Sequence, residues 1–203
     1  SILQVKNSKK ICVEFTSMSK TYAMAGWRIG FAVGNKNLIA ALTKIKSYLD
    51  YGAFTPVQVA AVEALNGPPS YIEQIRNEYR RRRDTLIRSM ARAGWEIPEP
   101  PATMFAWAPL PKKFETMGSM EFAKLLMIKA SVAVAPGIGF GEYGEGYVRI
   151  GLVENEHRIR QAAKSIRKLI NENRNLLPDL DLIGFMCLFY LLMYSFGNFI
   201  LEH

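Results

Sequence analysis

Short apolar runs and longer stretches with helical spacing alternate along the first half of the chain. Residues 10–15 and 28–34 are apolar runs of strand length, and the second begins and ends near glycine. Apolar side chains recur three and four residues apart in three further segments, which predict helices over 37–48, 56–65 and 71–92. Thr55 is expected to cap the second helix, and Gly94 is typical of the end of the third. The polar residues 16–19 predict a turn after the first strand.

The second half of the chain predicts further strands interleaved with helices. The expected strands are residues 104–107, 132–136 and 147–152, the last two separated by a glycine-rich loop. One helix is expected to begin at Ser119 and another after Asn155, because both side chains are typical of a helix N-cap. Strands mixed with helices throughout indicate an α/β fold, with a division between two parts near the long helix.

Composition narrows the class of protein. The 203 residues are 49% hydrophobic and 22% charged, which is typical of a globular protein and excludes disordered, collagen-like and disulfide-dense chains. The net charge of +8 permits anionic partners. The densest basic run, Arg80 to Arg83, lies within the predicted helix 71–92 and is interpreted as a solvated helix face, so no nucleic-acid partner is expected. Cys12 and Cys187 have no metal-binding spacing, which indicates a reducing, cytoplasmic setting and no metal site.

The C-terminal tail differs from the rest of the chain. Residues 182–201 carry no charge and have about the length that a helix needs to cross a bilayer. Three interpretations remain open: a membrane anchor, a buried or interface helix, and a sequence that replaces an original ending. The last residues, Leu201, Glu202 and His203, resemble the start of an affinity tag. Membrane attachment is therefore expected only through residues 182–201.

Two catalytic patterns occur without their usual context. Ser17 and Lys20 match the S-x-x-K of penicillin-binding enzymes, but the companion motifs of that family do not follow. Gly139, Gly141 and Gly144 match G-x-G-x-x-G, but a strand follows where a dinucleotide site needs a helix. Neither pattern supports a function.

A third pattern combines groups that suit one cofactor. Ser17, Ser19 and Lys20 are followed by Arg28 and by glycines at 26 and 30. A lysine beside other cationic groups is a candidate for Schiff-base chemistry, and a serine with an arginine suits a phosphate. An amine for an aldehyde and a site for a phosphate are the two requirements of pyridoxal phosphate.

These residues resemble the pyridoxal-phosphate attachment signature of class I/II aminotransferases. The resemblance covers about residues 1–170 and is strongest to alanine (glutamate–pyruvate) transaminases and diaminopimelate-aminotransferase-like members. It rests on segments 17–30, 51–58, 79–84, 94–95, 135–141 and 148–150. It implies the C-terminal portion of the fold type I large domain plus the α+β small domain. The implied division is 1–70 for the large-domain part, 71–175 for the connecting helix and small domain, and 176–203 for the tail.

The resemblance also implies roles for individual residues. Lys20 forms the Schiff base and moves the proton, while Ser17 and Arg28 hold the cofactor phosphate. Arg149 clamps the substrate carboxylate, and strand alternation independently places it on the face opposite Val148. The resemblance further implies three residues near the active site, namely Ser19, Tyr51 and Thr55.

The expected function is transfer of an amino group between an L-amino acid, alanine in the first place, and 2-oxoglutarate or pyruvate. The family's ring-contacting aspartate has no match in this sequence. We therefore expect either a homodimer or pairing with an N-terminal half. The alternative is a non-catalytic remnant that acts as an interaction or membrane-attached module.

Overall fold

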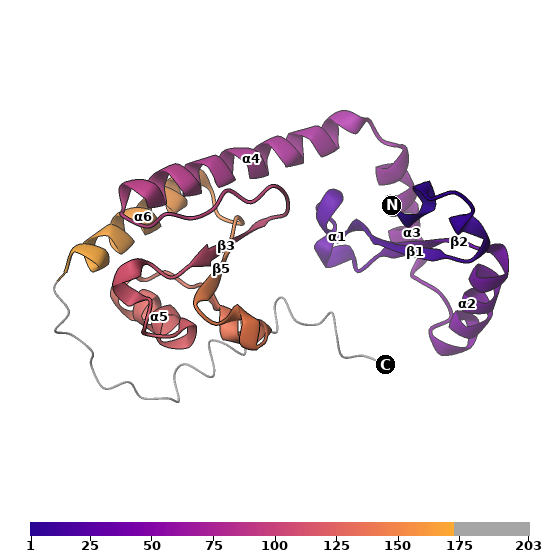
Figure 1. The fold of residues 1–203 in the computed structure, drawn as a ribbon. Coiled ribbons are helices and arrows are strands. Elements are labelled where there is room, and N and C mark those ends of the chain that lie inside the picture. The colour runs from indigo at the N-terminus through magenta and orange to yellow at the C-terminus, as the bar shows by residue number, and fades with distance from the viewer. Residues whose placement is uncertain (173–203) are drawn as a thin grey trace. The chain divides into compact units, whose positions relative to one another are not determined.

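The computed structural model of the protein describes residues 1–172 (Figure 1). The chain forms two compact units, Ser1–Arg80 and the part from Arg81 onward, and each is described by itself. The division falls inside the long helix α4 (Pro69–Arg92). The boundary expected after residue 70 lies near the start of this helix, and the assignment of large and small domains stays a prediction.

The first unit is built on a two-stranded antiparallel sheet. Strand β1 (Val13–Ser17) pairs with β2 (Gly30–Gly34) along its whole length, so that Ser17 lies opposite Gly30. The helices of this unit are α1 (Met18–Thr21), α2 (Lys36–Leu49) and α3 (Thr55–Asn66), with short 3-10 turns at Ile2–Gln4, Ser8–Lys10 and Ala25–Trp27. Met18, Met24 and Ala61 are its buried apolar residues. The core of this unit is therefore small.

The start of the first strand and the turn after it differ from the sequence prediction. Residues 8–10 form a 3-10 turn, and the Asn35 side chain donates to the Lys10 carbonyl, so the strand begins only at Val13. The predicted turn over 16–19 is wrong, because residues 16 and 17 still pair with β2. Helix α1 then begins at once, since the Ser17 hydroxyl accepts a hydrogen bond from the Ser19 N–H at 3.1 Å.

The three helices predicted for the first half are confirmed to within two residues at each end. Gly94 follows α4 with φ of +86°, and the Trp95 N–H donates to the Met90 carbonyl, as expected for a glycine-terminated helix. At α3, Phe54 is the N-cap and Thr55 is the first helical residue, so the helix begins one position earlier than the prediction of Thr55 as the cap.

The second unit has an α+β architecture. Its three-stranded antiparallel sheet has the order β3-β5-β4, with β3 (Phe105–Pro109), β4 (Ala135–Pro136) and β5 (Tyr147–Gly151). Helix α5 (Ser119–Leu125) continues into a π-helical turn, Leu126–Ala130, and α6 (Glu156–Asn171) closes the described chain. Gly118 precedes α5 as its N-cap, so Ser119 is the first helical residue rather than the predicted cap. Short 3-10 turns span Lys112–Phe114, Gly137–Phe140 and Glu142–Gly144.

Strand β4 is shorter than the predicted strand 132–136. Ser131 adopts φ of +55°, and the Val132 N–H still donates to the Leu126 carbonyl of the preceding helical turn. This backbone group is therefore committed to closing the helix, and only Ala135 and Pro136 pair with β5.

One face of the second unit's sheet is buried and the other is open. Ala106, Ala108 and Val148 are fully buried on the first face. Trp95 lies in the same core, where its indole N–H donates to the Pro109 carbonyl at 2.7 Å and its ring meets Phe122 edge-on. Alternation along the strands places Trp107, Tyr147 and Arg149 on the opposite face.

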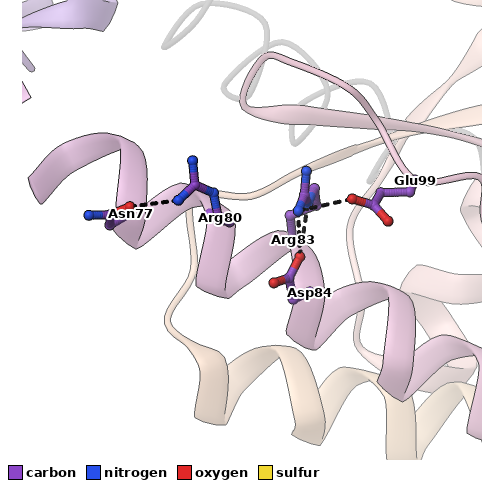
Figure 2. Close-up of polar contacts among 5 residues, drawn as sticks. All are labelled: Asn77, Arg80, Arg83, Asp84 and Glu99. Atoms are coloured by element: carbon purple, nitrogen blue, oxygen red, sulfur yellow. Dashed lines mark hydrogen bonds and ion pairs between the residues drawn. The ribbon is translucent and has the colours of Figure 1, made fainter. Parts of the chain in front are cut away.

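The basic run on α4 is more than a solvated helix face. Figure 2 shows Arg83 between the carboxylates of Asp84 and Glu99, with nitrogen–oxygen distances of 2.8 and 2.9 Å, and Arg80 donating to Asn77. Arg82 donates to two backbone carbonyls after β5. The prediction was thus incomplete, since part of this charge holds α4 to the rest of the second unit.

Candidate functional site

The connection between β1 and β2 carries the predicted attachment lysine. Lys20 lies in the single turn of α1, and its side chain is exposed. The backbone of this turn is held in place because Met18 is fully buried and its N–H donates to the Ile29 carbonyl at 3.1 Å. The Met24 N–H donates to the Met18 carbonyl, which closes the loop behind the lysine. Lys20 is therefore an exposed amine on a turn whose backbone is held in place by hydrogen bonds and by the buried Met18.

The two predicted phosphate ligands lie on the same connection. Ser17 ends β1, and Arg28 stands two residues before Gly30, which pairs with Ser17. Arg28 adopts a left-handed conformation with φ of +50°, and its guanidinium donates to the Ala25 carbonyl at 2.9 Å. A Cβ on Gly30 would lie 2.8 Å from the Thr16 carbonyl oxygen, so this close strand pairing requires glycine. One local motif thus supplies an amine, a hydroxyl and a guanidinium.

The three remaining candidates lie in different surroundings. Ser19 is buried in α1 beside Lys20. Tyr51 is 91% exposed, with φ of +54°, between α2 and α3, and Thr55 is exposed at the start of α3. No hydrogen bond within residues 1–172 joins Tyr51 or Thr55 to the Lys20 turn, and their roles stay predictions.

Arg149 lies in the second unit, on the open face of its sheet. It is directly opposite Trp107 of β3 and Ala135 of β4, so it occupies the central strand. Its guanidinium carbon lies 4.4 Å from the ring centroids of both Phe105 and Phe140. Burial lowers the pKa of the Arg149 guanidinium, which nevertheless stays protonated. The placement of Arg149 on the face opposite Val148, expected from alternation, is confirmed.

Sequence reasoning missed the aromatic residues around this arginine. Trp107 meets Phe140 edge-on at 5.6 Å between centroids and stacks on Tyr147 at 5.7 Å. Phe105 and Trp107 alternate on one strand of the sheet, which was a usable signal. Phe140 comes from the glycine-rich turn Gly137–Phe140, and its position depends on tertiary packing that no local pattern reveals.

A buried serine anchors that glycine-rich turn. The Ser119 hydroxyl, which is fully buried, donates to Glu145 and accepts from the Ile138 N–H, both at 3.1 Å. Glu145 also accepts from the backbone N–H groups of Ser119 and Gly146. These bonds lower the pKa of the Glu145 carboxyl, with the bond from Gly146 as the largest cause.

Comparison with known proteins gives the family. The sequence model for "Aminotransferase class I and II" matches residues 1–166, most of the chain. This chain belongs to the class I and II aminotransferases. Class I and II aminotransferases are enzymes that use pyridoxal 5′-phosphate, as the resemblance implied. The family favours an enzyme over the alternative of a non-catalytic module.

Individual relatives of this aminotransferase chain match most of its length. AatC of Rhizobium meliloti (strain 1021) is 64% identical over 171 residues, 84% of this chain and 42% of AatC. The glutamate-pyruvate aminotransferase AlaC of Escherichia coli (strain K12) is 51% identical over 178 residues, 88% of this chain and 43% of AlaC. The substrate-bound structure of BacF from Bacillus subtilis matches with a TM-score of 0.79 and 35% identity, over 87% of this chain and 44% of BacF. The chain thus spans less than half the length of these relatives.

The groups on the β1–β2 connection fit the family's cofactor. Pyridoxal phosphate needs an amine for its aldehyde and donors for its phosphate, and Lys20, Ser17 and Arg28 provide these three groups. Within residues 1–172 no three His, Cys, Asp or Glu side chains gather as a metal site would require. The same residues include no helix long and apolar enough to span a bilayer, and the candidate anchor 182–201 lies outside them.

Proposed function

We propose that this chain is part of a transaminase that transfers the amino group of L-alanine to 2-oxoglutarate, giving pyruvate and L-glutamate. The observation that carries the proposal is the β1–β2 connection, where one short motif supplies Ser17, Lys20 and Arg28. The choice of alanine is supported by the 51% identity to AlaC, whose name is glutamate-pyruvate aminotransferase.

Each residue of the motif has a separate task in this proposal. The Lys20 amine would hold the cofactor aldehyde, and the same amine is positioned in this proposal to move the proton that leaves the substrate α-carbon. Ser17 and Arg28 hold the phosphate through a hydroxyl and a charged fork of N–H donors. When bound, the cofactor supplies an electron sink for the negative charge at the α-carbon. Ser19, Tyr51 and Thr55 are proposed to border this site.

Arg149 has the task of binding the substrate. Within residues 1–172 its guanidinium is paired with no carboxylate, although it is partly buried. A planar carboxylate that accepts two parallel hydrogen bonds suits such a group. We assign to Arg149 the α-carboxylate of the amino acid and of the 2-oxo acid.

Borohydride trapping tests the attachment residue without relying on activity. The full chain is incubated with pyridoxal phosphate, reduced, digested and analysed by mass spectrometry. We expect the pyridoxyl group on the peptide that contains Lys20, and its loss in Lys20→Ala. Lys36→Ala is the matched control, because Lys36 is also exposed at the start of a helix. Equal labelling of several lysines, or labelling elsewhere that persists in Lys20→Ala, would contradict the proposal.

We further propose that the chain pairs with the remainder of an aminotransferase subunit, and that complete subunits form a dimer in the cytoplasm; the open strand edges of the first unit support the pairing. A sheet of two strands is marginal on its own, and both β1 and β2 leave one edge without a strand partner within the described residues. Phe15 of β1 is 72% exposed. The next residue, Thr16, belongs to the other face of the sheet and lies opposite the partly buried Phe31 of β2. Co-expression with the N-terminal part of AlaC, followed by co-purification, tests this pairing; separate elution of the two polypeptides would count against it.

A further inference from the structure

The surroundings of Arg149 differ from those of three other arginines in the second unit. Arg83 and Arg160 pair with carboxylates, and Arg82 donates to backbone carbonyls. Arg149 instead contacts the rings of Phe105 and Phe140, both at 4.4 Å from the guanidinium carbon. A guanidinium packed against rings keeps its N–H donors, which lie in its own plane, available for a planar acceptor.

The two rings come from different elements, and each is held in place separately. Phe105 is fixed by its position on β3, opposite Gly151 of the central strand. Phe140 ends the 3-10 turn that the Ser119 hydroxyl anchors through the Ile138 N–H. Trp107 supports Phe140 from the sheet through an edge-on contact. The Arg149 guanidinium thus contacts two rings that come from different elements.

We propose that Phe105 and Phe140 are positioning residues that fix the Arg149 guanidinium in the orientation that binds a carboxylate. The proposal rests on the proposed function, because it takes the substrate carboxylate as the partner of Arg149. A long arginine side chain loses rotamer entropy when it is held in one geometry. Rings that hold it before the ligand arrives remove that cost from binding. Phe105 and Phe140 therefore act on affinity through Arg149, and neither takes part in proton transfer.

The test uses the full chain with ¹⁵N-labelled arginine and follows the Nε–H resonance of Arg149, assigned by its loss in Arg149→Lys. Propionate, an unreactive carboxylate of the size of alanine, is the binding probe. In Phe140→Leu and Phe105→Leu we expect the resonance to lose its ring-current shift, and the affinity for propionate to fall about threefold to tenfold. Phe140→Tyr keeps a ring and is expected to retain both properties.

Tyr143→Leu is the matched control, since Tyr143 lies three residues from Phe140 and its side chain is fully exposed. It is expected to leave the resonance and the affinity unchanged. Phe140 is 49% exposed, so its replacement by leucine opens no buried cavity. If the Arg149 resonance in Phe140→Leu stays at its wild-type position, or if the affinity for propionate is unchanged, the positioning role is overturned. Retention of propionate binding in Arg149→Lys overturns the carboxylate assignment instead, and the two failures are therefore distinguishable.

Discussion

Replacing the buried serine that anchors the glycine-rich turn is expected to destabilise the second unit and release Phe140. In Ser119→Ala, the Ile138 N–H loses its acceptor and Glu145 loses one of its donors, both at 3.1 Å in the wild type. The serine side chain is fully buried, so water cannot replace it without rearrangement. Each such bond contributes about 0.5–1.5 kcal/mol, so the free energy of unfolding should fall by about 1–3 kcal/mol.

Urea unfolding measured by circular dichroism gives the change in free energy, and amide hydrogen exchange of Ile138 reports whether the turn opens locally. We expect faster exchange at Ile138 in the variant, because its N–H no longer donates to a side chain. Ser165→Ala on α6 is the control, since it removes the same hydroxyl from a residue outside this network. A loss below about 0.5 kcal/mol together with unchanged exchange at Ile138 would refute the reasoning.

Three further substitutions test the same unit. Trp95→Phe should cost about 2–4 kcal/mol in urea unfolding, because it shrinks a buried side chain and leaves the Pro109 carbonyl without its donor; a cost near zero would contradict this. Gly137→Ala should cost about 2–3 kcal/mol, since a Cβ there would overlap the carbonyl oxygen of Gly144, whereas Gly139→Ala, with open space around it, should be nearly neutral. The hydrogen bonds that lower the pKa of Glu145 contribute stability that is complete above its ordinary value of 4.5 and is lost as the pH falls through the lower folded value. From about pH 6 to about pH 3 the wild type should therefore lose more unfolding free energy than Glu145→Gln, and equal losses would argue against this role.

Helices were predictable from sequence where an apolar stripe and a terminating residue agree. Helix α4 has both, since its apolar spacing is regular and Gly94 follows it in a left-handed conformation. Strand ends were not predictable, because pairing decides them. Strand β1 begins where Val13 meets Gly34, and β4 begins only after the helical turn before it has closed at Val132.

The same distinction between local pattern and tertiary contact applies to the residues of the candidate site. Lys20, Ser17 and Arg28 form a continuous motif, and alternation alone placed Arg149 on the face opposite a buried valine. The ring of Phe140 belongs to a turn whose position depends on Ser119, 21 residues earlier in the sequence. A contact between segments that far apart leaves no trace in local spacing.

The two units differ in how well they support their candidate residues, and this determines which role can be measured in this chain alone. Arg149 lies on a sheet whose other face, which includes Ala108 and Val148, is buried. Its geometry therefore depends on contacts that the second unit itself supplies. The Lys20 turn rests on a small core around Met18, and the first unit leaves Phe15 exposed. Carboxylate binding at Arg149 should therefore be observable in the full chain even where cofactor attachment at Lys20 is weak. The reverse result would be firm cofactor attachment at Lys20 without carboxylate binding at Arg149. It would mean that the small core of the first unit is sufficient for attachment, and that the rings around Arg149 are not sufficient for carboxylate binding.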